Sequence, residues 1–325
     1  MLGASGASVV VMAPHPDDES IAAGGLIQVA LALGARVTVV LLTDGDNNPW
    51  PQRVIERRVW IGLRDRERWG QRRRDEARAA LAILGIPDSS IRHLGWPDLG
   101  LTHCLMTDAA ATVSMLRDVF LDAAPTVVIL PTLSDRHPDH SAAHVMCCLA
   151  LSASGSIAQL LSYTIHGTTS APAIECGIDV HRREQKKRAV GAYHTQLVLS
   201  HKRIMAHAER PERFVIDAAI RDGVTSSLER LPWRISRLSA ALADVVVVGG
   251  NGAWCVAIAA ADSVTRDGAS PRCVRDNNGQ LHLRMPEQLR ISSPAFAKLR
   301  CRLSSPWIYD RWGWTRLASA DSQRR

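Results

Sequence analysis

The chain has 325 residues, of which 46% are hydrophobic and 22% charged, a composition typical of a soluble globular protein with a sizeable core. Its formal net charge of +7 and pI of about 9.3 favour anionic partners such as phosphates, nucleic acid or an acidic membrane face. Because the N-terminus lacks a basic region and no long apolar run is uninterrupted, we expect neither a signal peptide nor a membrane-spanning helix.

The N-terminal segment predicts a β-α-β unit. Residues 8–13, "SVVVMA", form a β-branched run that is typical of a buried strand. Residues 20–34 are rich in Ala and Leu and end in Gly, as helices often do, and residues 36–45 form a second buried strand. Two strands joined by a helix imply parallel pairing with a right-handed crossover.

The same alternation continues along the chain. Apolar spacing and composition predict helices at residues 71–85, 107–123 and 181–196. They predict strands at residues 91–96, 126–132 and 160–167, so the two kinds of element alternate along most of this region. Strands that alternate with helices predict an α/β fold, in the form of a Rossmann-like, doubly wound, mostly parallel sheet flanked by helices. We expect this sheet within about residues 1–200.

The pattern changes near residue 210. Strand-like segments at 213–220, 245–248, 254–260 and 281–285 follow, with "GGNG" and "DNNG" as turn signals. We therefore expect two domains, an α/β domain over residues 1–210 and a smaller β-rich extension over residues 211–325, which ends in a basic, Trp-rich tail.

Acidic and histidine side chains follow the ends of the predicted strands. In an open α/β sheet, ligands bind beyond the carboxyl ends of the strands, so these side chains should converge on one edge. They are His15, Asp17, Asp18 and Glu19 after the first strand, Asp44 and Asp46 after the second, and Asp135, His137, Asp139 and His140 after the strand at 126–132.

Packed carboxylates and imidazoles are tolerated where a cation lies among them. His and Asp ligands suit Zn²⁺, although such sites also take Fe²⁺ or Co²⁺. A carboxylate that is not a ligand can act as general base, and a protonated imidazole can stabilise an oxyanion or assist a leaving group. Each cluster alone is also compatible with a solvated turn, but two His-Pro-Asp clusters after buried strands favour a metal site.

At these residues the sequence resembles the LmbE-like, or PIG-L, family of metal-dependent N-acetylglucosaminyl deacetylases. The resemblance covers about residues 8–215 and makes residues 1–210 the expected catalytic domain. Six parts of the family signature occur in order: "PHPDDE" (14–19), "TDGD" (43–46), "RRDEARAALAILGI" (73–86), "LGWPDLGL" (94–101), "HPDH" (137–140) and "KKRAVGAYHTQ" (186–196), the last with Thr195 where Ser is usual.

The resemblance implies a role for each of these side chains. It makes His15, Asp18 and His140 the metal ligands, and Asp17 the general base. His137 would stabilise the oxyanion and protonate the leaving amine, and its neighbour Asp139 would raise its pKa and hold its orientation. The implied reaction is hydrolysis of an N-acetyl amide to acetate and a free amine. The substrate-binding residues would be Arg73, Asp98 and His194.

The Arg-rich segment from Arg53 to Arg78 has two interpretations. It could form a surface for phosphate groups or a membrane face, or a solvated helical face with many ion pairs. The neighbouring segment "NNPWPQ" (47–52) could form a lid in which Trp50 stacks on a sugar ring, or Trp50 could simply pack against the insertion.

We therefore expect a zinc-dependent hydrolase that deacetylates an N-acetylglucosamine-type sugar, with a lipid- or phosphate-linked substrate suggested by basicity and the Trp-rich tail. The alternative is a metal-dependent amidase or deacylase acting on a non-sugar N-acyl substrate. A nucleic-acid partner is not expected, because no recognised binding motif is present. Intact Asp17 and His137 argue against an inactive binding module. Seven cysteines without a CxxC pair predict reduced, buried thiols and a cytoplasmic protein, with peripheral contact to an anionic membrane as an option.

Overall fold

The computed structural model describes residues 6–217, 228–250, 252–260, 271–286, 294–303 and 308–318. By their packing the residues form two compact units, one of residues 1–101, 122–135 and 157–219, and one of residues 102–121, 136–156 and 220–325. Among the described residues, no helix combines the length and apolar composition needed to cross a bilayer. Part of the predicted C-terminal tail, residues 304–307 and 319–325, and Asn251 of the predicted "GGNG" turn lie outside the described residues.

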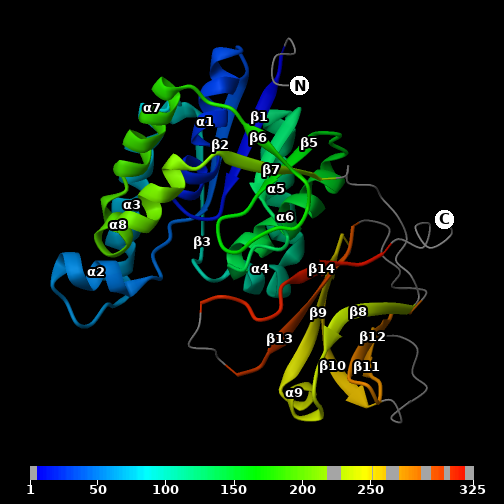
Figure 1. The fold of residues 1–325 in the computed structure, drawn as a ribbon. Coiled ribbons are helices and arrows are strands. Elements are labelled where there is room, and N and C mark those ends of the chain that lie inside the picture. The colour runs from blue at the N-terminus through cyan, green and yellow to red at the C-terminus, as the bar shows by residue number, and fades with distance from the viewer. Residues whose placement is uncertain are drawn as a thin grey trace. The chain divides into compact units, whose positions relative to one another are not determined.

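The first unit is built on a mostly parallel sheet flanked by helices (Figure 1). Its strands are β1 (Ser8–Ala13), β2 (Arg36–Thr43), β3 (Ile91–Trp96), β4 (Val127–Pro131), β5 (Gln159–Tyr163), β6 (Ala173–Cys176) and β7 (Glu212–Asp217). Its helices are α1 (Asp18–Ala32), α2 (Pro49–Glu56), α3 (Leu63–Ile83), α7 (Val180–Gly191) and α8 (His194–Glu209), with a 3-10 turn at Asp88–Ser90.

The strand order of this sheet is β3-β2-β1-β4-β5-β7-β6. The pairs from β3 through β5 are parallel, whereas β7 runs antiparallel to β5 and β6. This order confirms the predicted β-α-β start and the predicted mostly parallel sheet. It places the carboxyl ends of β1, β2 and β4 at one edge, where the predicted site residues begin.

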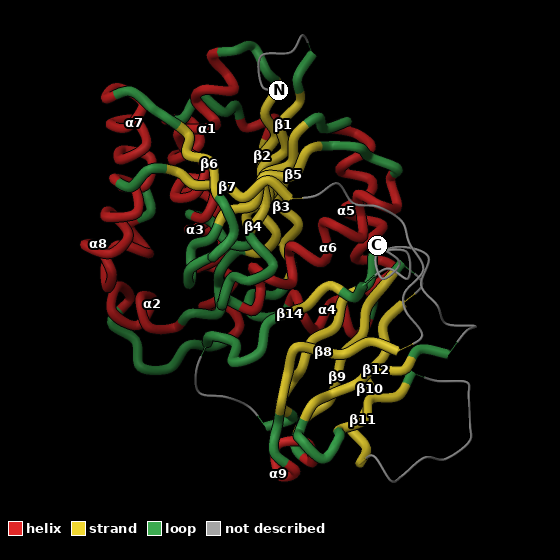
Figure 2. The backbone as a smooth tube through the Cα atoms, turned by 45° about the vertical axis from the view of Figure 1, so that its right-hand side comes forward, coloured by secondary structure: helices red, strands yellow, loops and turns green. Residues whose placement is uncertain are grey.

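The central strands of this sheet are buried. Every residue of β1 and β4 is buried, and Val and Ile dominate both strands. Helices α1, α3 and α7 pack together over the sheet, as Figure 2 shows in red. Their Ala- and Leu-rich faces join the strands in one core that includes Val11, Ala23 and Leu81.

The second unit contains a second sheet together with three helices, α4 (Leu101–Thr107), α5 (Ala109–Ala123) and α6 (Pro138–Ser154). The strands are β8 (Leu228–Arg234), β9 (Ala243–Gly249), β10 (Gly252–Ala260), β11 (Arg272–Arg275), β12 (Gln280–Arg284), β13 (Phe296–Cys301) and β14 (Trp314–Arg316), and a short helix α9 spans Arg237–Ala241. The order is β14-β13-β9-β10-β11-β12-β8, and only the β10–β11 pair is parallel. The predicted β-rich C-terminal part is therefore confirmed.

Three details differ from the sequence predictions. Residues 213–217 of the strand predicted at 213–220 lie in β7, which pairs with β5 in the first sheet instead of joining the C-terminal sheet, while residues 218–220 lie outside the described residues. The helix predicted at 107–123 is α5, which begins at Ala109, and it is preceded by a helix that was not predicted, α4. The helix predicted at 181–196 ends at Gly191 before α8 begins. The cysteines are free thiols, as predicted, but Cys255 and Cys301 are exposed and not buried.

Candidate active site

The loop after β1 buries an unusual number of ionisable groups. His15, Asp17, Asp18 and Glu19 are each at most 9% exposed. They lie between the last residue of β1 and the first turn of α1, so the carboxyl edge of the sheet positions them as the sequence predicted. Burial of charge at this density requires compensating contacts.

The backbone of Asp17 is strained. Its φ of 119° and ψ of −31° lie outside the regions that a residue with a side chain normally adopts. The surrounding contacts hold it there, because the Asp17 amide donates to Glu19 Oε2 at 3.1 Å and the Asp17 carbonyl accepts from the Ile21 amide at 2.9 Å. Strained backbone held in this way is found mostly at functional sites.

Glu19 anchors this loop from within the protein. Its side chain is fully buried and accepts hydrogen bonds from the Ser20 hydroxyl at 2.6 Å and from the hydroxyl of Tyr193, which is itself fully buried. Burial raises the pKa of Glu19 and, together with the adjacent carboxylate, that of Tyr193. Glu19 and Tyr193 lie 174 positions apart in the sequence, so residue pattern alone does not predict their contact.

The Asp17 carboxyl has a strongly shifted pKa. Burial, and then repulsion from Asp18, raise it to about 7, while attraction to Arg73 opposes the shift. A general base acts most effectively when its pKa lies near the working pH. A cation bound beside it would lower this value.

Arg73 braces two loops at the same edge of the sheet. Its guanidinium, in a residue only 4% exposed, donates to the Pro16 carbonyl and the Gly45 carbonyl, both at 2.6 Å. One nitrogen also lies 3.9 Å from Asp17 Oδ2. Gly45 has a φ of +61°, and a Cβ there would lie 1.6 Å from the guanidinium, so only glycine fits. Arg73 therefore holds the backbone on which Asp17 sits, while its predicted contact with substrate stays a prediction.

The imidazole of His15 lies between two carboxylates. Nδ1 is 3.2 Å from Asp18 Oδ2, and Nε2 is 3.2 Å from Asp98 Oδ1. Burial opposes ionisation of Asp98, but its hydrogen bonds with His15 and the Asn47 amide prevail and lower its pKa. A neutral ring has one donor nitrogen only, so one of the two contacts needs a further proton, on the ring or on the carboxyl group, or a cation in its place. This crowding of acceptors fits a site for a metal ion.

The "HPDH" motif occupies the start of α6. His137 is the N-cap residue, and its Nδ1 accepts a hydrogen bond from the Asp139 amide at 3.3 Å. A nitrogen that accepts a hydrogen bond carries no proton, so this contact leaves the proton of a neutral His137 on Nε2. The backbone amide of Asp139 thus orients the His137 ring. The sequence predicted that Asp139 would orient His137 through its carboxylate, and residue identity alone does not tell a backbone contact from a side-chain contact. The rings of His137 and His140 lie 4.9 Å apart, centroid to centroid.

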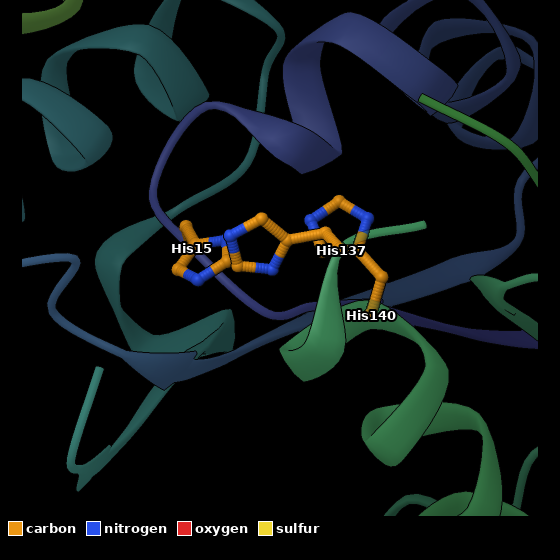
Figure 3. Close-up of side chains that lie close together, drawn as sticks. All are labelled: His15, His137 and His140. Carbon is orange, nitrogen blue, oxygen red and sulfur yellow. The ribbon is translucent and has the colours of Figure 1, made fainter. Parts of the chain in front are cut away.

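Candidate metal ligands from distant parts of the sequence come together. One ring nitrogen each of His15, His137 and His140 lies within 4.8 Å of the others, and Figure 3 shows the three imidazoles side by side. A second group of the same size consists of His15, Asp98 and Asp139. Asp98, predicted to bind substrate, is thus also placed as a candidate ligand. Predicted ligand Asp18 belongs to neither group, but its carboxylate contacts His15. Buried imidazole and carboxylate donors suit Zn²⁺ and related divalent ions.

The remaining acidic residues at the sheet edge have structural contacts. Asp44 pairs with Arg74, and Asp135 accepts hydrogen bonds from the amides of Ile165 and His166. Burial, with repulsion from Asp98, raises the pKa of Asp46.

His194, a predicted substrate residue, is exposed at the first position of α8.

The closing motif is tied to α3 through a neighbour of His194. The Thr195 hydroxyl donates to Glu76 Oε2 at 2.5 Å, and the Thr195 amide contacts both oxygens of the same carboxylate. Thr195 and Glu76 are both buried. Threonine thus provides the hydroxyl that serine would provide at this position.

Comparison with known proteins gives a family match for part of the chain. Residues 10–151 match the family PIG-L, described as GlcNAc-PI de-N-acetylase. Two curated relatives are named 1D-myo-inositol 2-acetamido-2-deoxy-alpha-D-glucopyranoside deacetylase. The one from Corynebacterium glutamicum strain R is 30% identical over 151 residues, 43% of this chain and 51% of that protein. The one from Saccharomonospora viridis is 31% identical over 188 residues, 53% and 66% of the two chains.

The chain therefore spans between half and two thirds of the length of these relatives. Among solved structures, the conserved protein TT1542 from Thermus thermophilus aligns with a TM-score of 0.51 and 24% identity, covering 71% of this chain and all of that one. At this level of identity the likeness extends to the fold alone, and it agrees with a mixed α/β architecture.

Proposed function

Because residues 10–151 match the family PIG-L, GlcNAc-PI de-N-acetylase, we propose that this chain is a metal-dependent hydrolase that deacetylates an N-acetylglucosamine-type sugar, releasing acetate and a free amine. The relatives named as GlcNAc-inositol deacetylases make a GlcNAc-inositol compound the first substrate to test. The observation that carries the proposal is the cluster of His15, His137 and His140 with the buried, strained Asp17 two residues from His15.

We propose His15, Asp18 and His140 as the metal ligands and Zn²⁺ as the ion, with Fe²⁺ or Co²⁺ as alternatives. The contact between Asp18 and His15 supports placing these two on the same ion. When bound, the ion would polarise the acetyl carbonyl and make a water molecule more acidic. Asp98 and Asp139 provide carboxylates close enough to His15 to adjust the charge of the site.

The proton transfers fall to the protein. Asp17 takes a proton from the attacking water, and its position depends on Arg73 and Glu19, which hold the flanking backbone. His137 donates a hydrogen bond from Nε2 to the developing oxyanion, in an orientation fixed by the Asp139 amide, and Asp17 passes the proton that it took from water to the leaving amine. Collapse of the tetrahedral intermediate breaks the C–N bond and yields acetate and the amine.

The wider assignments are also proposals. The order β3-β2-β1-β4-β5 supports the proposal of a Rossmann-like, doubly wound sheet with its site where the strand order reverses. We also propose a catalytic domain followed by a β-rich extension, and the pairing of β7 with β5 supports a boundary after residue 217. We propose that Asp98, Arg73 and His194 bind the substrate. We also propose that the protein is cytoplasmic and makes peripheral contact with an anionic membrane.

A substrate panel tests the proposed function. Purified, metal-loaded protein is incubated with N-acetylglucosamine, a GlcNAc-inositol, N,N′-diacetylchitobiose and several N-acetyl amino acids, and acetate release is measured. We expect release from the amino sugars and little from the amino acids. The reverse preference would support a deacylase for non-sugar N-acyl compounds and contradict the proposal.

A further inference from the structure

Large apolar side chains are exposed together on one short segment of the first unit. Trp60 is 86% exposed, Leu63 79% and Val59 74%, while Trp50 and Val54 are 62% and 51% exposed. Single exposed apolar residues are ordinary on protein surfaces, but a contiguous group usually marks a surface that contacts another molecule. We call these five residues, together with Arg57 and Arg64, the Trp60 surface.

Helix α2 presents one half of this surface. Pro51 and Gln52 are buried and Ile55 is half-buried, on the side by which α2 packs against α8. Trp50 and Val54 are one turn apart and therefore share the opposite, exposed side. In Figure 1 the helix and the loop after it project from the edge of the unit.

The loop between α2 and α3 presents the other half in a fixed conformation. The Asp65 carboxylate accepts hydrogen bonds from Arg58 at 2.7 Å, the Gly62 amide at 3.0 Å and Arg68 at 2.9 Å. Arg68 also pairs with Glu56 at 2.5 Å. These contacts pin both ends of the loop, so Val59 and Trp60 are held outward, and little ordering is needed when a partner binds.

The charge around these side chains is positive. Residues 53–68 contain six Arg and three acidic residues, and two of those acids, Glu56 and Asp65, are engaged by Arg58 and Arg68. Within the described residues, the exposed Arg57 and Arg64 have no acidic partner. Arg53 stacks on Trp50, with its guanidinium carbon 4.8 Å from the ring centroid. The surface therefore offers unneutralised guanidinium groups beside Trp and aliphatic side chains.

We propose that the Trp60 surface docks this protein on an anionic lipid bilayer. Trp partitions into the membrane–water interface, aliphatic side chains enter the acyl region, and each nearby Arg adds attraction to anionic headgroups. Val54, Val59 and Leu63 favour a lipid over a nucleic acid, whose bases stack on aromatic rings but offer nothing to aliphatic chains. The inference uses no catalytic residue and does not depend on the activity proposed above.

Vesicle sedimentation tests the proposal. Full-length protein is mixed with phosphatidylcholine vesicles, or with equimolar phosphatidylcholine and phosphatidylglycerol vesicles, and the bound fraction is measured at rising salt concentration. We expect binding to the anionic vesicles alone, weakening with salt. The Val59→Ser/Trp60→Ser variant should bind about tenfold more weakly. Arg57→Gln should bind about fivefold more weakly, as expected for one interfacial charge.

Matched controls lie at the opposite edge of the sheet. Ile157, 98% exposed, precedes the amino end of β5, and Arg36 is the exposed first residue of β2, whereas α2 follows the carboxyl end of β2. Ile157→Ser and Arg36→Gln should therefore bind as the wild type does. Equal binding by all variants, or no binding of the wild type to anionic vesicles, would overturn the proposal. Binding to a single-stranded oligonucleotide that is lost in Val59→Ser/Trp60→Ser, without vesicle binding, would replace the lipid by a nucleic acid.

Discussion

Two regions of the first unit reverse the usual distribution of polar and apolar side chains. The loop after β1 buries Asp17, Asp18 and Glu19, whereas the Trp60 surface exposes Trp60 and Leu63. Either arrangement costs free energy in the isolated protein, because buried charge loses hydration and exposed apolar surface orders water. The two regions differ in what offsets this free energy. The loop is held by internal contacts, while the Trp60 surface leaves its apolar side chains largely exposed and is explained by an external partner.

The largest expected effect is at the metal site. His15→Ala removes the imidazole common to both groups of candidate ligands, so bound metal and deacetylation should fall to background. The metal content of purified protein and the rate of acetate release measure the two. His201→Ala, at an exposed position of α8, is the control and should match the wild type. Full metal content in His15→Ala would mean that the buried cluster is not a metal site.

A smaller loss is expected where the internal contacts hold Asp17. In Glu19→Gln the amide NH₂ group faces either the Asp17 amide, which then loses its acceptor, or the Ser20 and Tyr193 hydroxyls, which must turn to accept instead of donating. Misplacement of Asp17 should lower kcat by about 10- to 100-fold. KM and metal content should change little, which separates positioning from a general loss of structure. Unchanged kcat would remove Glu19 from the account.

The third prediction concerns the stability of the fold and not catalysis, and it tests a buried ion pair elsewhere in the unit. Lys186 and Glu212 are fully buried, 2.6 Å apart, and Glu212 also accepts from the amides of Gly25 and Leu26. Lys186→Met leaves a buried carboxylate without its cation and should reduce the free energy of unfolding by about 3–5 kcal/mol. Urea unfolding measures this loss.

A neighbouring ion pair is the matched control for that change. Lys187 pairs with Glu209 at the surface, so Lys187→Met should cost about 0–1 kcal/mol. Equal costs for the two variants would show that burial does not decide the value of a charge here. The comparison between buried and exposed regions would then lose its basis.

Much of the fold could be predicted because it follows from local patterns. The buried runs of β1, β2 and β4 are short, β-branched and bounded by turn residues, and parallel pairing then brings their carboxyl ends to one edge. The convergence of His15 with His137 and His140 followed from that topology. The pairing of β7 with the first sheet did not follow, because the choice of neighbouring strand depends on long-range packing.

The contacts that hold the site in place could not be predicted from the sequence, because they too depend on long-range packing. Arg73 bonds to the backbone carbonyls of Pro16 and Gly45, and a carbonyl leaves no trace in residue identity. Glu19 and Tyr193 meet only through the fold. Helix α2, by contrast, had a readable signal, because Asn48 caps it and Pro49 occupies its first position.

The central claim is that Asp17 is buried beside the metal ligands in order to transfer protons and is not a ligand itself. The most direct test is Asp17→Asn, with metal content and acetate release measured on the same preparation. We predict a metal content equal to that of the wild type and a rate lower by about 10²- to 10⁴-fold, as expected for loss of a general base. Loss of the metal, or retention of the wild-type rate, would contradict the account.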